Sequence, residues 1–138
     1  MQASLDAFHE LSYYTLAHPG EDFIHQHVVD AFAAQNASPD DKPIKVAFAL
    51  IGLHLHLERG FSGRQDQLTH MRLARDRKSW PTFVTPSDHG SLTVHDVLRR
   101  SAGPERDAAI HDWCATVWST WRHVHTQVRT LAGGANDA

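Results

Sequence analysis

Residues 43–60 read PIKVAFALIGLHLHLERG, and this stretch decides the fold class. A proline opens it and a glycine closes it, an asymmetry that is typical of an α-helix. The alternation LHLHLE over residues 53–58 is also typical of a half-buried strand, which would place His54, His56 and Glu58 on one face. A helix is favoured, because both helix boundaries are present and the chain offers no second strand to pair with this one.

Turn-forming residues divide the rest of the chain into helical segments as well. Further helices are expected over about residues 4–17, 21–36, 64–78, 93–100 and 104–131. The sequence therefore predicts an all-α fold, a helical bundle of four main helices plus one or two short helices, with at most a trivial strand pair near Trp80 to Val84. Residues 1–132 are expected to form a single helical domain, and residues 133–138 a disordered tail.

The composition is that of a soluble globular protein: 41% of the residues are hydrophobic, 21% are charged, and the formal net charge is −3. Five basic residues between Arg64 and Lys78 are interpreted as a solvated helix face, so no nucleic-acid partner is expected. The longest apolar run, from Val46 to Leu57, is too short to span a bilayer, and the N-terminus lacks the pattern of a signal peptide. A cytoplasmic location without membrane contact follows, and a homo-oligomer is compatible with the composition.

Twelve of the 138 residues are histidine, and six of them form three His-x-His pairs. Residues two apart on a helix point about 200° from each other, so only one member of each pair can face the core. The apolar positions around the pairs predict that His25, His54 and His125 are more buried than His27, His56 and His123. Inward-facing imidazoles are unusual, and neutral imidazole serves both as a metal ligand and as a proton-transfer group.

Three consecutive helices each place one such polar side chain on an inward face: His25, Glu58 and His70. Helical bundles build their metal sites from facing side chains of this kind. Two imidazoles and one carboxylate suit a divalent metal (Zn, Fe, Mn or Ni) and leave positions open for water or substrate. His54, one turn before Glu58, is a further candidate ligand. The sequence thus predicts a divalent-metal-binding protein, a metal-dependent hydrolase or transferase that acts on a small molecule.

An alternative needs no metal. The same inward polar groups, Glu58, His54 and His70 together with Gln35, could form a hydrogen-bonded network that only fixes how the helices pack. The chain would then be a non-catalytic helical interaction or sensor module. Elemental analysis of the purified protein separates the two hypotheses.

Several strings along the chain resemble a family of small uncharacterised bacterial proteins, a domain of unknown function. They include FIHQHVVDAF at residues 23–32, KPI at residues 42–44 and HMRLA at residues 70–74. The resemblance covers most of the chain and implies a compact single domain, without naming an activity. It also implies a tyrosine at the position of His54, which makes the other three candidates the safer ligands.

The expected architecture is also similar to that of the DinB-like bundles. Those proteins hold a divalent metal with three histidines in a helical cavity and include thiol transferases. The present chain lacks the His-x-x-x-His pair that they carry on the last helix. The likeness therefore concerns architecture, and their chemistry applies here only by analogy.

Overall fold

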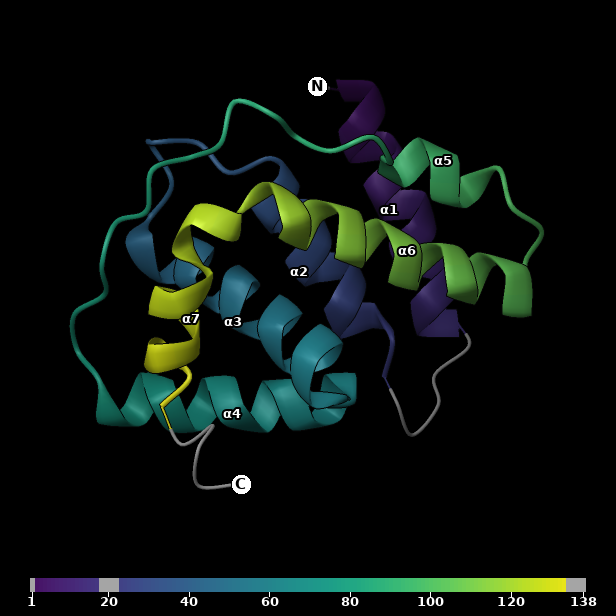
Figure 1. The fold of residues 1–138 in the computed structure, drawn as a ribbon. Coiled ribbons are helices and arrows are strands. Elements are labelled where there is room, and N and C mark those ends of the chain that lie inside the picture. The colour runs from purple at the N-terminus through teal and green to yellow at the C-terminus, as the bar shows by residue number, and fades with distance from the viewer. Residues whose placement is uncertain (1, 18–22, 134–138) are drawn as a thin grey trace.

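Every regular element of the described residues is helical (Figure 1). The computed structural model describes residues 2–17 and 23–133. The elements are α1 (Gln2–Ala17), α2 (His25–Gln35), α3 (Pro43–Arg59), α4 (Gly63–Asp76), α5 (Val94–Leu98), α6 (Pro104–Thr120), the 3-10 helix η1 (Arg122–Val124) and α7 (His125–Leu131). No strand occurs within these ranges, so the predicted all-α class is confirmed and the alternating stretch 53–58 is helical.

The number of helices differs from the expected four main ones. Five described helices are 11 residues or longer, and the helix expected over 104–131 is interrupted. The interruption occurs at Trp121, which leaves helical geometry with φ −102° and ψ 20°. Its side chain is fully buried and its indole Nε1 donates to the carbonyl of Ala34 at 3.2 Å. This anchor turns the chain, so that α7 lies beside α3 (Figure 1).

Helix α3 lies among the other helices and packs against α2, α4, α6 and α7 (Figure 1). Its ends are those that the sequence predicts. Pro43 occupies the first turn, and Gly60 closes the helix in the left-handed conformation with φ 69°. Nine of its residues are buried, which agrees with the apolar character of nearly every direction around it.

The start of α4 is fixed by a capping box. The hydroxyl of Ser62 accepts a hydrogen bond from the backbone N–H of Gln65, and the side chain of Gln65 accepts one from the backbone N–H of Ser62. Residues 60–62 connect α3 to α4. Asp66, in the first turn of α4, faces the core and is fully buried.

The segment between α4 and α5 contains no regular element and runs around the outside of the bundle (Figure 1). Gln35 at the end of α2 holds it in place. The Gln35 amide donates to the carbonyls of His89 and Leu92 at 2.8 and 2.7 Å and accepts from the indole of Trp113 at 2.9 Å. Gln35 thus pairs with this segment, and not with Glu58, His54 and His70 as the packing-network hypothesis supposed.

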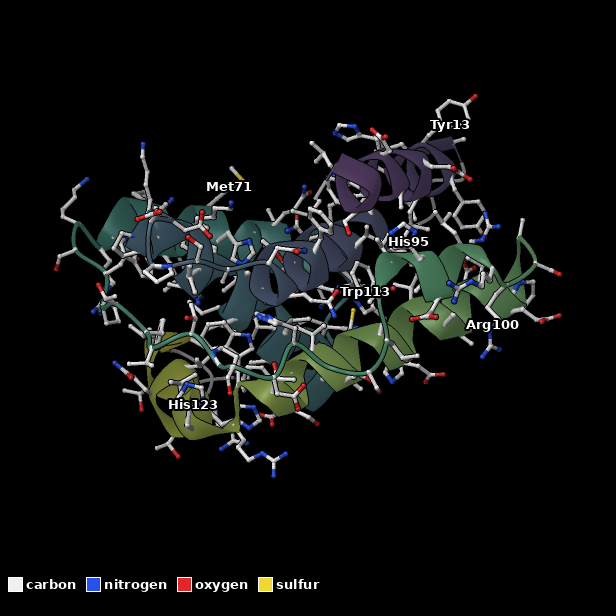
Figure 2. The ribbon with its side chains drawn as sticks, turned by 90° about the horizontal axis from the view of Figure 1, so that it is seen from above. Tyr13, Met71, His95, Arg100, Trp113 and His123 are labelled. Carbon is white, nitrogen blue, oxygen red and sulfur yellow. The ribbon has the colours of Figure 1, made fainter. Side chains whose placement is uncertain are left out.

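The core is continuous through the bundle and is rich in tryptophan. Trp113 lies in the middle of the packed helices, whereas Tyr13 and Met71 project from the outer surface (Figure 2). Over the described ranges, no helix is both long and apolar enough to cross a membrane. The tail predicted for residues 133–138 lies, apart from Gly133, outside the described residues.

Candidate functional site

Two of the four predicted metal ligands lie in separate surroundings. His25 begins α2, where its Nδ1 is 3.0 Å from the hydroxyl of Thr15 on α1. His70 is buried in α4 and stacks on Phe48, with ring centroids 4.6 Å apart. Burial lowers the pKa of His70 to about 4, so this imidazole is neutral at pH 7.

Glu58 and His54, the other two predicted ligands, do meet. The His54 Nδ1 is 2.8 Å from Glu58 Oε1, and the same carboxylate accepts two hydrogen bonds from Arg129 at 2.8 Å and one from the indole of Trp118 at 3.2 Å. The bonds from Arg129 are the main reason why the pKa of Glu58 falls to about 2. Both carboxylate oxygens are thus engaged in joining α3 to α6 and α7.

The structure therefore does not bring His25, Glu58 and His70 to one point. Among residues 2–17 and 23–133, no group of three or more His, Cys, Asp or Glu side chains is arranged so that it could hold a metal ion. The part of the packing-network hypothesis that the contacts support is the pair of His54 and Glu58.

Replacing Glu58 with glutamine is expected to lower the free energy of unfolding by about 1 to 2 kcal/mol at pH 7, since a partly exposed charged acceptor of several hydrogen bonds is lost. The folded-state pKa of about 2 lies below the ordinary value of 4.5. The stabilisation is therefore complete above about pH 4.5 and disappears as the pH falls towards 2. Urea unfolding at pH 7 and pH 3 measures this difference, with the exposed Glu10→Gln as control. A loss of equal size at both pH values would show that the carboxylate charge is not the cause.

Two of the three His-x-His pairs face as predicted. His54 is more buried than His56, and His125 is more buried than His123. The pair on α2 is reversed, because His27 is only 4% exposed while His25 is half-buried. Helix α2 packs against α1, α3, α4 and α6, so its polar side is covered as well as its apolar side.

Around His27 the structure assembles a cluster of five titratable side chains that we call the histidine–aspartate cluster. Its members are His27 and Asp30 of α2, His56 of α3, Asp66 of α4 and His111 of α6. Nδ1 of His27 lies 3.3 Å from Oδ2 of Asp66, and the His27 and His56 rings stack with centroids 3.7 Å apart. Nε2 of His56 lies 3.3 Å from Nδ1 of His111, which is exposed. The cluster thus runs from the core to the surface.

The two carboxyl groups are the buried end of this cluster. Asp66 is 0% exposed and Asp30 is 3% exposed. Gln26 donates to one oxygen of Asp30 at 3.0 Å, while the other oxygen and both oxygens of Asp66 have no hydrogen bond within the described residues. Burial raises the pKa of Asp66 to about 8 and, together with the charge of Asp66, raises the pKa of Asp30 well above its usual range. Asp66 is therefore mainly protonated at pH 7, and its contact with His27 is one between a neutral acid and an imidazole.

Gly52 of α3 makes room for Asp30. A Cβ atom at Gly52 would lie 1.9 Å from Oδ2 and 2.5 Å from Cγ of Asp30. Helices α2 and α3 can approach this closely only because the position carries no side chain. The glycine thus fixes the place of the Asp30 carboxyl in the cluster.

A pocket of about 500 Å³ opens at the surface end of the histidine–aspartate cluster. Its polar wall includes His27, His56 and His111, and its apolar wall includes Phe61 and Ile110. Burial, followed by the neighbouring histidines, lowers the pKa of His56 to about 4, so this ring is neutral at pH 7. A cavity of this size, mainly apolar with a few convergent polar groups, is typical of a small-molecule site.

Sequence reasoning missed most of this cluster. It assigned His27 and His56 to the outside and gave no role to Asp30, Asp66 or His111. Two local signals were available: His27 and Asp30 are three residues apart and share a helix face, and a glycine interrupts the most apolar helix. Neither signal identifies a partner, because Asp66 and His111 come from other helices.

The fold and the cluster define a class of protein: an all-α bundle with imidazole and carboxyl groups packed between its helices, beneath a pocket. The chain belongs to a family of unknown function, DUF5946, whose model matches residues 5–122. The predicted relation to an uncharacterised family is thereby confirmed. The match contains every member of the cluster, whereas Arg129, the partner of Glu58, lies beyond it. No curated protein and no solved structure is significantly similar to the chain.

Proposed function

We propose that the chain binds a small polar molecule in the pocket above the histidine–aspartate cluster and catalyses a hydrolysis or group transfer on it. One observation carries the proposal: imidazoles from three different helices line one pocket, with the fully buried Asp66 behind them. Burying carboxyl oxygens that lack a hydrogen bond costs stability, so packing alone is a poor reason for such a cluster. Perturbed titratable groups beside a cleft are typical of functional sites.

The charges around the pocket indicate the kind of molecule that it accepts. Asp107 of α6 contributes a carboxylate, and its Oδ1 accepts a hydrogen bond from the hydroxyl of Tyr14 at 3.0 Å. Among the described residues that line the pocket, none is lysine or arginine. Arg59 and Arg106 stack on Phe61 and Tyr14 outside the lining. The charge that lines the pocket itself is the Asp107 carboxylate, so a neutral or cationic polar molecule is the expected ligand.

A fragment screen that follows the protein by NMR tests the proposal. Neutral and cationic fragments are expected to shift the amide signals of residues 60–65 and the ring signals of His56 and His111. His111→Gln and Asp107→Asn should weaken these hits, whereas the exposed His123→Gln, whose ring contacts the carbonyl of Val84, should leave them unchanged. A second pocket, of about 460 Å³, lies beside Gln35 and His89. Hits confined to that second pocket, or a preference for anions, would contradict the proposal. Complete absence of hits would favour a non-catalytic module.

A further inference from the structure

We propose that His56 and His111 chelate one divalent transition-metal ion at the wall of this pocket, the remaining ligands coming from solvent or from the bound molecule. The inference rests on the proposed function, because it names the cofactor of the same site. It also replaces the ligand set that was expected from the sequence. The Glu58 carboxylate of that set already accepts two hydrogen bonds from Arg129.

The separation of the two ring nitrogens carries the proposal. Nε2 of His56 and Nδ1 of His111 are 3.3 Å apart, and the two rings are nearly perpendicular at 81°. Two imidazole nitrogens that bind one tetrahedral Zn²⁺ at about 2.0 to 2.1 Å are themselves separated by about 3.3 Å. Without an ion, the same two nitrogens form a long hydrogen bond, with one ring as donor and the other as acceptor. Their separation is also that of two neighbouring ligands of one ion.

The His56 ring is held in place before any ion binds. It stacks on the ring of His27, whose centroid is 3.7 Å away. Metal-binding histidines are commonly held in a fixed orientation by the groups around them. An ordered ring loses little conformational freedom on binding, which favours affinity.

A carboxylate lies one helical turn before His111, although in the described residues it is not arranged with the two rings as a group of three ligands. Asp107 and His111 are four residues apart on α6, so they share a helix face, and both line the pocket. The described lining residues hold no lysine or arginine that would repel a cation. Imidazole ligands suit Zn²⁺, Ni²⁺ and Cu²⁺ better than Mg²⁺ or Ca²⁺. An ion with so few protein ligands keeps positions open, where it could polarise a bound small molecule or water.

Zinc titration of the full-length protein, stripped with a chelator and followed by calorimetry, tests the proposal. Wild type is expected to bind one Zn²⁺ per chain, and His56→Gln and His111→Gln should each weaken binding by about tenfold or more. His25→Gln and His70→Gln are the matched controls, because they remove histidines of the earlier ligand set, and they should bind as wild type does. Circular dichroism checks that each variant keeps its helices. His111 is exposed, so its variant remains informative even if His56→Gln does not fold.

Saturable binding that both pocket variants weaken, and neither control does, supports the chelate. Absence of saturable binding, unchanged affinity in both pocket variants, or a loss confined to the controls each overturns it. The fragment screen in the presence of chelator separates this result from the proposed function. Fragments that still bind the pocket without Zn²⁺ uptake would leave the small-molecule site in place and remove only the metal.

Discussion

Gly52→Ala is expected to destabilise the protein by about 2 to 3 kcal/mol, near the upper part of the range for overpacked cores. The new methyl group would lie 1.9 Å from an oxygen of Asp30, whose side chain is buried. Either the two helices separate or the carboxyl group leaves its position. Urea unfolding at pH 7 measures the loss.

The matched control for this prediction is the same substitution with the clash removed. In an Asp30→Ala background, Gly52→Ala meets no carboxyl group and should cost little or even stabilise, since alanine favours a helix interior by about 1 kcal/mol over glycine. Asp30→Asn keeps the shape of the side chain, so in that background Gly52→Ala should lower the free energy of unfolding as much as it does in wild type. A double-mutant cycle therefore isolates the contact. If Gly52→Ala costs the same in the Asp30→Ala background, the close approach of α2 and α3 is not its cause.

Wild type is expected to lose stability as the pH rises, and Asp66→Asn is expected to lose less. The folded-state pKa of Asp66 is about 8, above its ordinary value of 3.8, so the folded protein holds this proton more tightly than the unfolded chain. The stabilisation is complete below about pH 4 and is lost as the pH rises to about 8. Within that window the free energy of unfolding falls by about 1.4 kcal/mol for each pH unit.

Buried histidines oppose this slope in the lower part of the window. The pKa values of His56 and His70 are lowered to about 4, so the unfolded chain binds their protons more tightly, and these groups raise stability as the pH increases to about 6.5. Above pH 6.5 these two histidines no longer contribute to the slope, whereas Asp66 still does. Wild type should therefore lose about 2 kcal/mol between pH 6.5 and pH 8 through Asp66.

The measurement compares urea unfolding of wild type and Asp66→Asn at several pH values between 5 and 9, with chelator present. The variant should show a shallower decline, with some slope remaining from Asp30, whose pKa is raised in the same direction. Asp76→Asn, on the exposed end of α4, should keep the wild-type profile. Parallel profiles for wild type and Asp66→Asn would mean that the carboxyl is ionised in the folded protein at pH 7.

Local signals along the chain were enough to predict the fold class and several element ends. Pro43 and Gly60 bound α3 because the missing N–H of proline and the left-handed conformation of glycine act within one turn of the helix. The segment between residues 78 and 93, where no helix is expected from the sequence, likewise contains no regular element. The break at Trp121 has no such signal. It coincides with a hydrogen bond from the Trp121 indole to the carbonyl of Ala34, 87 residues away in the sequence.

For the candidate site too, the sequence predicted some features and not others. Helical periodicity correctly predicted which histidine of a pair is more buried on α3 and in the last helical region. It failed on α2, because α4 lies against the side of this helix that carries His27, and Asp66 of α4 meets His27 there. The sequence by itself determined that the chain is helical, where several helices begin and end, and that it carries many histidines. Only the tertiary structure decided which of them meet, since His27, His56, Asp66 and His111 come from four helices, and contacts between helices are not encoded in the periodicity of any one of them.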